Sequence, residues 1–165
     1  KNLRTTPEAL DELRLKSVEQ VFGKHGVLSP EELLSRFKVQ EEQYLTAVDI
    51  ERDTLRLIVN EMVLPAALAE RAQLAMGAKA MLGLDLDWSV ERTAIQNLNQ
   101  AIKALQERGD AVGVLAKAAG HDAHMVAQTV VPALAGVREI VDHLEGMLAD
   151  GRWPLPKYRE LLFMI

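Results

Sequence analysis

The sequence predicts an all-α fold, an elongated bundle of about five helices with two proline-bent long helices and an extended C-terminal tail. Three observations lead to this prediction. Apolar residues recur at spacings of three and four, glycine and proline punctuate these runs, and no segment alternates as a strand would. The chain has 165 residues, of which 48% are hydrophobic, so it can bury a core of its own. We therefore expect a single helical domain over residues 1–165.

Two capped helices are predicted in the N-terminal third. In the sequence TPE at residues 6–8, Thr6 is the expected N-cap and the proline the first helical residue. This helix should run until Gly23. The sequence SPEE at residues 29–32 gives the next start signal, because its last glutamate lies three residues after the serine, as in a capping box.

The middle of the chain predicts two further helices. Asp49 resembles an N-cap, and the apolar pattern after it continues to about Met81. The sequence DWS at residues 87–89 should open the fourth helix. Gly109 and Asp110 are expected to end it, because glycine is a poor helix former.

The last long helix has the most regular apolar pattern. Its apolar residues are separated by 4, 3, 4, 3 and 4 positions: Val130, Leu134, Val137, Val141, Leu144 and Leu148. This pattern predicts a seam that lies along a neighbouring helix.

Two prolines lie inside otherwise helical apolar runs. Pro65 and Pro132 each remove one backbone hydrogen bond and clash with the carbonyl four residues earlier. We expect each to bend its helix, at the carbonyls of Glu61 and Gln128 respectively. The sequence assigns these bends no role beyond shape.

Composition excludes several classes of function. The net charge of -5 argues against nucleic-acid or anionic-membrane binding, and no apolar run approaches the roughly 20 residues that span a bilayer. Cysteine is absent, which is compatible with a cytoplasmic location and excludes disulfides and thiolate metal sites. The chain starts at Lys1 and residues 1–5 resemble a linker, so we expect a segment cut from a longer protein.

The sequence shows no active site. His121 and His124 are spaced to share a helix face, but a zinc site needs a third ligand, and a solvated helix start at Asp122 explains them better. His143 resembles the acceptor histidine of phosphotransfer bundles, yet Glu145 lies where those domains carry lysine. We therefore predict no catalytic, cofactor-binding or metal-binding residue in this chain.

The C-terminal segment WPLPKYRELLF, residues 153–163, is rich in aromatic and apolar residues. Its prolines lack the PxxP spacing of polyproline ligands, so we interpret residues 151–165 as a docking tail. It should pack on the chain's own helices or on another subunit. The residues expected to make this contact are Trp153, Pro154, Pro156, Tyr158, Leu162 and Phe163.

Five segments, in order, resemble the C-terminal region of type III glutamine synthetases. They are NLRTTPEALDEL (2–13), VLSPEELLSRFKVQEEQYL (27–45), DIERDTLRLIVNEMVLPAAL (49–68), VVPALAGVREIVDHLEGML (130–148) and GRWPLPKYRELLF (151–163). The sequence departs from the family at Phe37, where tyrosine is more usual, and over residues 75–87, where no family pattern is matched.

The resemblance implies a parent enzyme that joins ammonia to glutamate, using ATP and Mg²⁺ or Mn²⁺ through a γ-glutamyl phosphate. It also implies a homo-oligomer, expected as a dodecamer, and an upstream catalytic domain that holds the active site. This segment would then be a structural or oligomerisation domain that is inactive alone. The alternative is a freestanding helical interaction module with no catalytic role.

Overall fold

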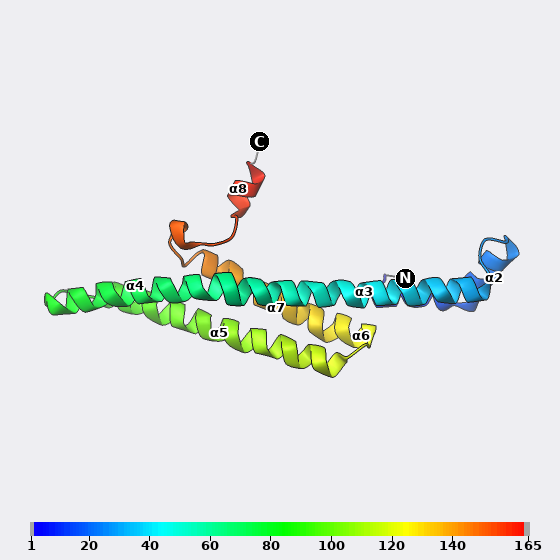
Figure 1. Cartoon of the computed structure of the whole chain (residues 1–165), viewed down its shortest axis with the longest axis horizontal. Coiled ribbons are helices and arrows are strands. Elements are labelled where there is room, and N and C mark those ends of the chain that lie inside the picture. The colour runs from blue at the N-terminus through cyan, green and yellow to red at the C-terminus, as the bar shows by residue number, and fades with distance from the viewer. Residues whose placement is uncertain (1, 164–165) are drawn as a thin grey trace. The chain divides into compact units, whose positions relative to one another are not determined.

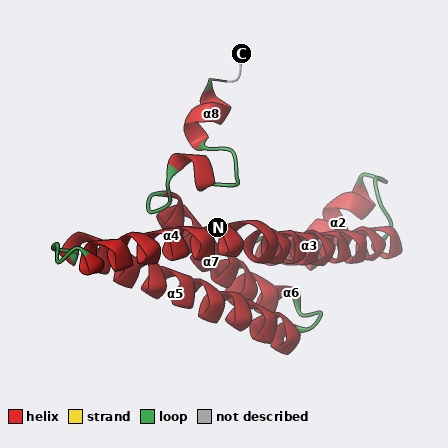
Figure 2. Ribbon diagram, turned by 60° about the vertical axis from the view of Figure 1, so that its left-hand side comes forward, coloured by secondary structure: helices red, strands yellow, loops and turns green. Residues whose placement is uncertain are grey.

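The computed structural model describes residues 2–163, with only the backbone of Tyr158 and Arg159. These residues form helices joined by short loops and contain no strand, which confirms the all-α prediction (Figure 2). The chain divides into two compact units, residues 1–53 with 112–134 and residues 54–111 with 135–165. The prediction of a single domain over residues 1–165 stays a prediction.

The first unit begins with a helix that is shorter than predicted. Helix α1 (Thr6–Asp11) is followed directly by the 3-10 turn η1 (Glu12–Arg14). An extended residue, Leu15, separates this turn from helix α2 (Lys16–Lys24). The predicted N-cap was wrong by one residue. Thr5 caps α1, because its hydroxyl accepts a hydrogen bond from the Glu8 N–H at 3.4 Å.

Helix α3 (Pro30–Ile58) starts where the sequence predicted. The Ser29 N–H donates to the Glu32 carboxylate at 2.7 Å and the Glu32 N–H donates to the Ser29 hydroxyl at 3.2 Å, which completes the capping box. The prediction that Asp49 starts a new helix was wrong. Its carboxylate pairs with Arg52 at 2.6 Å on the helix surface, so no backbone amide needs it as a cap.

Helix α5 (Ser89–Ala119) also differs from its predicted length. The expected stop at Gly109 was wrong, since burial of Val112 and Ala119 holds the helix together beyond two glycines that each disfavour it by about 1 kcal/mol. The helix ends at Gly120, whose φ of 56° is left-handed. After it, the Asp122 carboxylate accepts hydrogen bonds from the N–H groups of His124 and Met125 at 3.0 Å each, which confirms the predicted helix start.

The long helices of the second unit include α4 (Leu64–Gly83), the first part of α5 and most of α7 (Val131–Glu145) (Figure 1). Helix α4 and helix α5 form a hairpin through a short connection, residues 84–88. The core of this unit is aliphatic, and its largest fully buried side chains are Val63, Leu98, Leu105, Val137 and Leu144.

The predicted seam is confirmed, because all six of its residues are buried: Val130, Leu134, Val137, Val141, Leu144 and Leu148. In the first unit, short α6 (Ala123–Met125) packs on α1, and the His124 imidazole lies 2.9 Å from the Asp11 carboxylate.

A π-helical turn precedes each interior proline. They are η2 (Val59–Val63), directly before α4, and η3 (Val126–Val130), directly before α7. In η2 the Leu64 N–H donates to the Val59 carbonyl, five residues earlier. In η3 the Val131 N–H donates to the Val126 carbonyl, also five residues earlier. Each turn contains one of the carbonyls at which the sequence predicted a bend.

The π turns keep the buried side chains aligned. In the second unit Val59, Val63 and Ala67 are buried at two successive steps of four. In an ideal α-helix, two such steps would leave the third side chain rotated about the helix axis by roughly 80° from the first. The extra residue in the wider turn removes most of that rotation, so the three side chains stay on one face.

Candidate docking site

The C-terminal segment forms a closed loop followed by a short helix. The 3-10 turn η4 (Asp150–Arg152) and helix α8 (Tyr158–Leu162) flank the WPLP sequence. The Lys157 ammonium pairs with the Asp150 carboxylate and also donates to the Asp150 carbonyl at 3.3 Å. The Lys157 N–H in turn donates to the Glu160 carboxylate at 3.0 Å. The two ends of the WPLP loop are therefore tied together by charge.

An ion pair attaches this loop to helix α4. Arg152 Nε lies 2.9 Å from Oε2 of Glu70, whose side chain is mostly buried. That oxygen is close enough for an ion pair but is not aligned as a hydrogen-bond acceptor. Beside it, Trp153 is half-buried, and its indole N–H is buried without a hydrogen-bond partner among the described residues. The loop is thus attached to α4 by an ion pair, and the residue that follows the arginine carries a half-buried aromatic ring.

The predicted docking residues fall into two groups. Trp153 and Pro154 are half-buried in the anchored loop, and Pro156 is exposed. Leu162 and Phe163 are each 77% exposed, so within this chain they pack on little. The Tyr158 side chain lies outside the described part of the structure. The docking role of the whole set stays a prediction.

The two predicted bend residues lie at the surface. Pro65 and Pro132 are both exposed, and each follows a π turn whose valines are buried. Their predicted role in bending stays a prediction.

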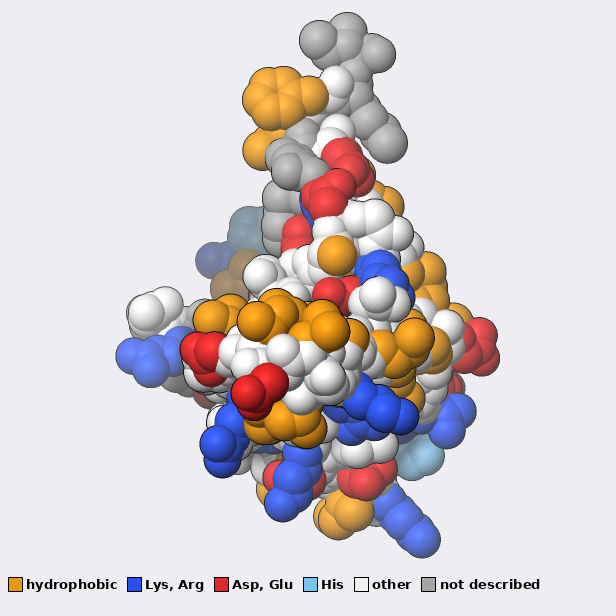
Figure 3. Space-filling view, turned by 90° about the vertical axis from the view of Figure 1, so that its left-hand side faces the viewer, with side chains coloured by type: hydrophobic (Ala, Val, Ile, Leu, Met, Phe, Trp, Pro, Cys, Tyr) orange, Lys and Arg blue, Asp and Glu red, His pale blue; other side chains and the backbone are white. Residues whose placement is uncertain are grey.

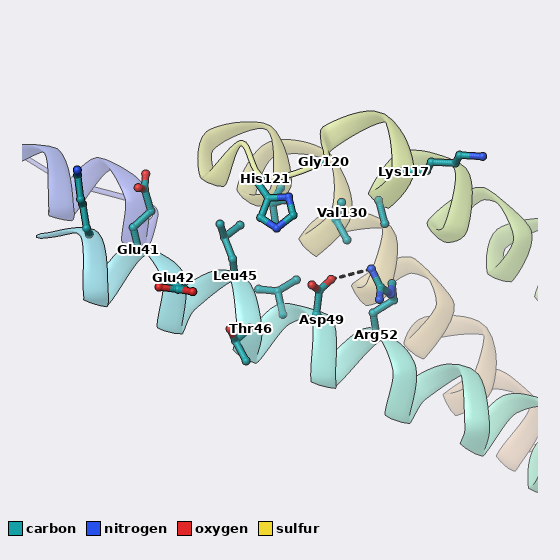
Figure 4. A pocket seen from close by; sticks show the side chains of 14 residues that line it. Glu41, Glu42, Leu45, Thr46, Asp49, Arg52, Lys117, Gly120, His121 and Val130 are labelled. Atoms are coloured by element: carbon teal, nitrogen blue, oxygen red, sulfur yellow. Dashed lines mark hydrogen bonds and ion pairs between the residues drawn. The ribbon is translucent and has the colours of Figure 1, made fainter.

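A groove of about 540 Å³ lies in the first unit, between α3 and the segment that joins α5 to α6 (Figure 4). Leu45 and Val130 contribute apolar walls, while Glu41, Glu42 and Asp49 line it from α3. The groove was missed in the sequence because its acidic side lies on a helix that we expected to be divided at Asp49.

The groove does not assemble a reactive group. The Asp49 carboxylate is paired with Arg52, and Lys117 points away from the other labelled side chains in Figure 4. His121 lines it, but His124 is engaged by Asp11 instead, so the two histidines do not converge. Within residues 2–163, excluding the two undescribed side chains, no group of histidine and carboxylate residues could hold a metal ion. The groove is a polar surface hollow.

Comparison with known proteins identifies the kind of segment this is. A family model described as the glutamine synthetase C-terminal domain matches residues 1–82. The chain belongs to this family. The type-3 glutamine synthetase of Dictyostelium discoideum is 30% identical over 99% of this chain and 24% of its own length. The glutamine synthetase of Bacteroides fragilis is 30% identical over 98% of this chain and 24% of its length, and that of Butyrivibrio fibrisolvens is 22% identical over 99% and 25%.

This glutamine synthetase C-terminal domain spans about a quarter of the length of these curated relatives. The resemblance seen in the five ordered segments is thereby confirmed. The family match favours a glutamine synthetase C-terminal domain over both the freestanding module and the phosphotransfer bundle. His143 is exposed on α7, as an ordinary polar-face residue. None of the described helices is long and apolar enough to cross a lipid bilayer.

Proposed function

We propose that this domain is a structural and assembly element of a glutamine synthetase that makes glutamine from glutamate, ammonia and ATP in the cytoplasm. In this proposal the reaction passes through a γ-glutamyl phosphate with Mg²⁺ or Mn²⁺, on a catalytic domain of the same polypeptide. The enzyme is a homo-oligomer, expected as a dodecamer. The observation that supports the proposal is that nearly the whole chain matches about a quarter of the length of each of two curated glutamine synthetases.

The surfaces of the domain support a role in assembly. Leu161, Leu162 and Phe163 are exposed at the end of α8, directly after the loop that the Lys157–Asp150 pair closes and that Arg152 attaches to α4. Because the closed loop fixes the start of α8, part of the conformational entropy of these apolar groups is already lost before they bind. We assign the docking role to this tail and propose that it packs against the catalytic domain or a neighbouring subunit.

The test compares the full-length polypeptide with a version truncated before Thr6. ATP-dependent formation of glutamine and the sedimentation of the particle are measured for both. We expect the truncated protein to form smaller particles and to lose activity in parallel, while the isolated domain forms no glutamine. An intact particle with unchanged activity after truncation would contradict the assembly role.

A further inference from the structure

The turn between α4 and α5 carries an unusual number of exposed apolar side chains. Five large apolar residues within fifteen positions are more than half exposed: Met76, Leu82, Leu84, Leu86 and Val90. Figure 3 shows the side of the molecule on which this turn lies, and hydrophobic side chains gather there beside acidic ones. The turn includes much of the stretch, residues 75–87, in which the family pattern was not matched. We call these five residues the hairpin patch.

The backbone of the turn holds the patch in place. The Leu86 N–H donates to the Met81 carbonyl at 3.0 Å and the Asp85 N–H donates to the Leu82 carbonyl at 3.2 Å. These two bonds form a Schellman motif with Asp85 as its left-handed residue, at a φ of 56°. Both bonds close the end of α4, so the exposed leucines belong to an ordered turn.

The charge around the hairpin patch is mainly negative. Asp85 and Asp87 are exposed in the connection, and the hydroxyl and N–H of Ser89 donate to the Asp87 carboxylate. These hydrogen bonds lower the pKa of Asp87 and favour its charged form. The Arg92 guanidinium lies 5.7 Å from the Trp88 ring centre, beside an open hollow of about 380 Å³. A surface that faces this patch should therefore be apolar at its centre and basic at its rim.

The size of the patch limits what can cover it. Five such side chains at roughly two-thirds exposure offer on the order of 300 Å² of apolar area, within the range of functional patches. A free-standing interface needs about 800 Å² from each partner. The patch is therefore too small to hold two free chains together, and it suits partners already held by other contacts.

The patch also lies at the far end of a long hairpin. Helix α4 has 20 residues, which extend about 30 Å from its π turn to the connection. Along this helix Leu82 lies 12 residues beyond Glu70, the C-terminal anchor, which is about 18 Å, although Met76 lies nearer to it. This reach favours a neighbouring subunit over a nearby part of the same polypeptide.

We propose that the hairpin patch inserts into an apolar, basic-rimmed surface on a second copy of the full-length polypeptide. This proposal rests on the proposed function, because the receiving surface lies in the part of the enzyme outside this chain. It adds a second contact, distinct from the C-terminal tail, between this domain and the assembly.

The first experiment places a photoreactive amino acid at Leu84 in the full-length protein, with Val114 as a control of equal exposure, 69%, in the other unit. Heavy and light isotope-labelled subunits are dissociated, mixed and reassembled before irradiation. We expect Leu84 to give heavy–light crosslinks to basic and apolar segments outside this chain, and Val114 to give few. Crosslinks confined to one isotope label, crosslinks only to residues of this chain, or yields no greater than those of Val114 would overturn the proposal.

The second experiment uses matched helix-surface variants, Leu82→Gln and Ile50→Gln, both at positions 63% exposed. Leu82→Gln should raise the concentration at which half of the particles dissociate roughly ten-fold, since losing a leucine contact weakens an interface by about that factor. Ile50→Gln should leave that concentration unchanged. Equal effects of the two variants would refute a contact at the patch. Activity and sedimentation of the unmodified enzyme test the proposed function separately, so the two failures are distinguishable.

Discussion

The same substitution, glycine to alanine, should change stability in opposite directions at two positions of the first unit. Gly113 lies inside α5 with an ordinary helical backbone, whereas Gly120 has a φ of 56°. An added Cβ meets nothing within 4 Å at either position, so the backbone alone decides the sign. Gly113→Ala should stabilise the fold by about 0.5–1 kcal/mol. Gly120→Ala should destabilise it by about 1 kcal/mol, because the left-handed conformation costs about 1–2 kcal/mol and the reduced entropy of the unfolded chain offsets only part of this.

The assay is urea unfolding of the isolated chain, followed by circular dichroism. For slopes of about 1–3 kcal/mol per molar urea, the midpoints of the two variants should lie on opposite sides of the parent midpoint and differ by about 0.5–2 M. The double variant should lie near the parent. A Gly120→Ala protein as stable as the parent would show that the helix does not end in a left-handed residue at Gly120. A Gly113→Ala protein less stable than the parent would show that Gly113 does not lie in an open, ordinary helical backbone.

Three further substitutions test the core, a cap and a titrating group. Leu144→Ala, at a fully buried seam position, should lower the free energy of unfolding by about 3 kcal/mol. Val114→Ala, at an exposed position, should change it by about 0.5 kcal/mol or less. Equal losses in the two variants would show that the seam is not part of the core. Asp122→Ala should cost about 1 kcal/mol in urea unfolding and Asp122→Asn much less, because the carboxylate caps two amide groups. Burial, and to a lesser degree the charge of Glu51, raises the pKa of Tyr44 above its ordinary value of 10.0. On raising the pH, the unfolded state therefore loses its phenol proton before the folded state does, so the free energy of unfolding should fall as pH rises from the ordinary pKa through the raised one. In the Glu51→Gln variant, ultraviolet titration should show a lower Tyr44 pKa than in the parent. An unchanged Tyr44 pKa would refute the contribution of Glu51.

Local signals predicted those parts of the fold that depend on neighbouring residues. The Ser29 capping box and the Asp122 helix start both formed as expected, because in each case a side chain reaches a backbone amide two or three residues away. The same kind of signal failed at Asp49, where an arginine one turn later takes the carboxylate. It also failed at Gly109, where burial of residues further along the helix outweighs the glycine.

The candidate site could be predicted only in outline. The aromatic and proline content of residues 153–163 indicated a docking tail. The ion pair of Arg152 with Glu70, however, joins residues 82 positions apart, so no local sequence pattern predicts it. The hairpin patch left a weaker signal, three leucines alternating with other residues at positions 82–86. Only Leu82 lies in α4, and Leu84 and Leu86 lie in the connection that follows it, so no helix face of the hairpin buries all three.

The two π turns have a consequence for how this domain can change by insertion and deletion. Each holds one residue more than an α-helical turn, so a deletion of a single codon within η2 or η3 returns the backbone to ordinary α-helix. The buried faces before and after the turn would then stay aligned, because Val59, Val63 and Ala67 would be separated by three and four positions of an ordinary helix. Lengths of related sequences can therefore vary by one residue at these turns without any change in the buried pattern on either side. A one-residue deletion elsewhere in these helices would instead turn one buried face by about 100° relative to the other.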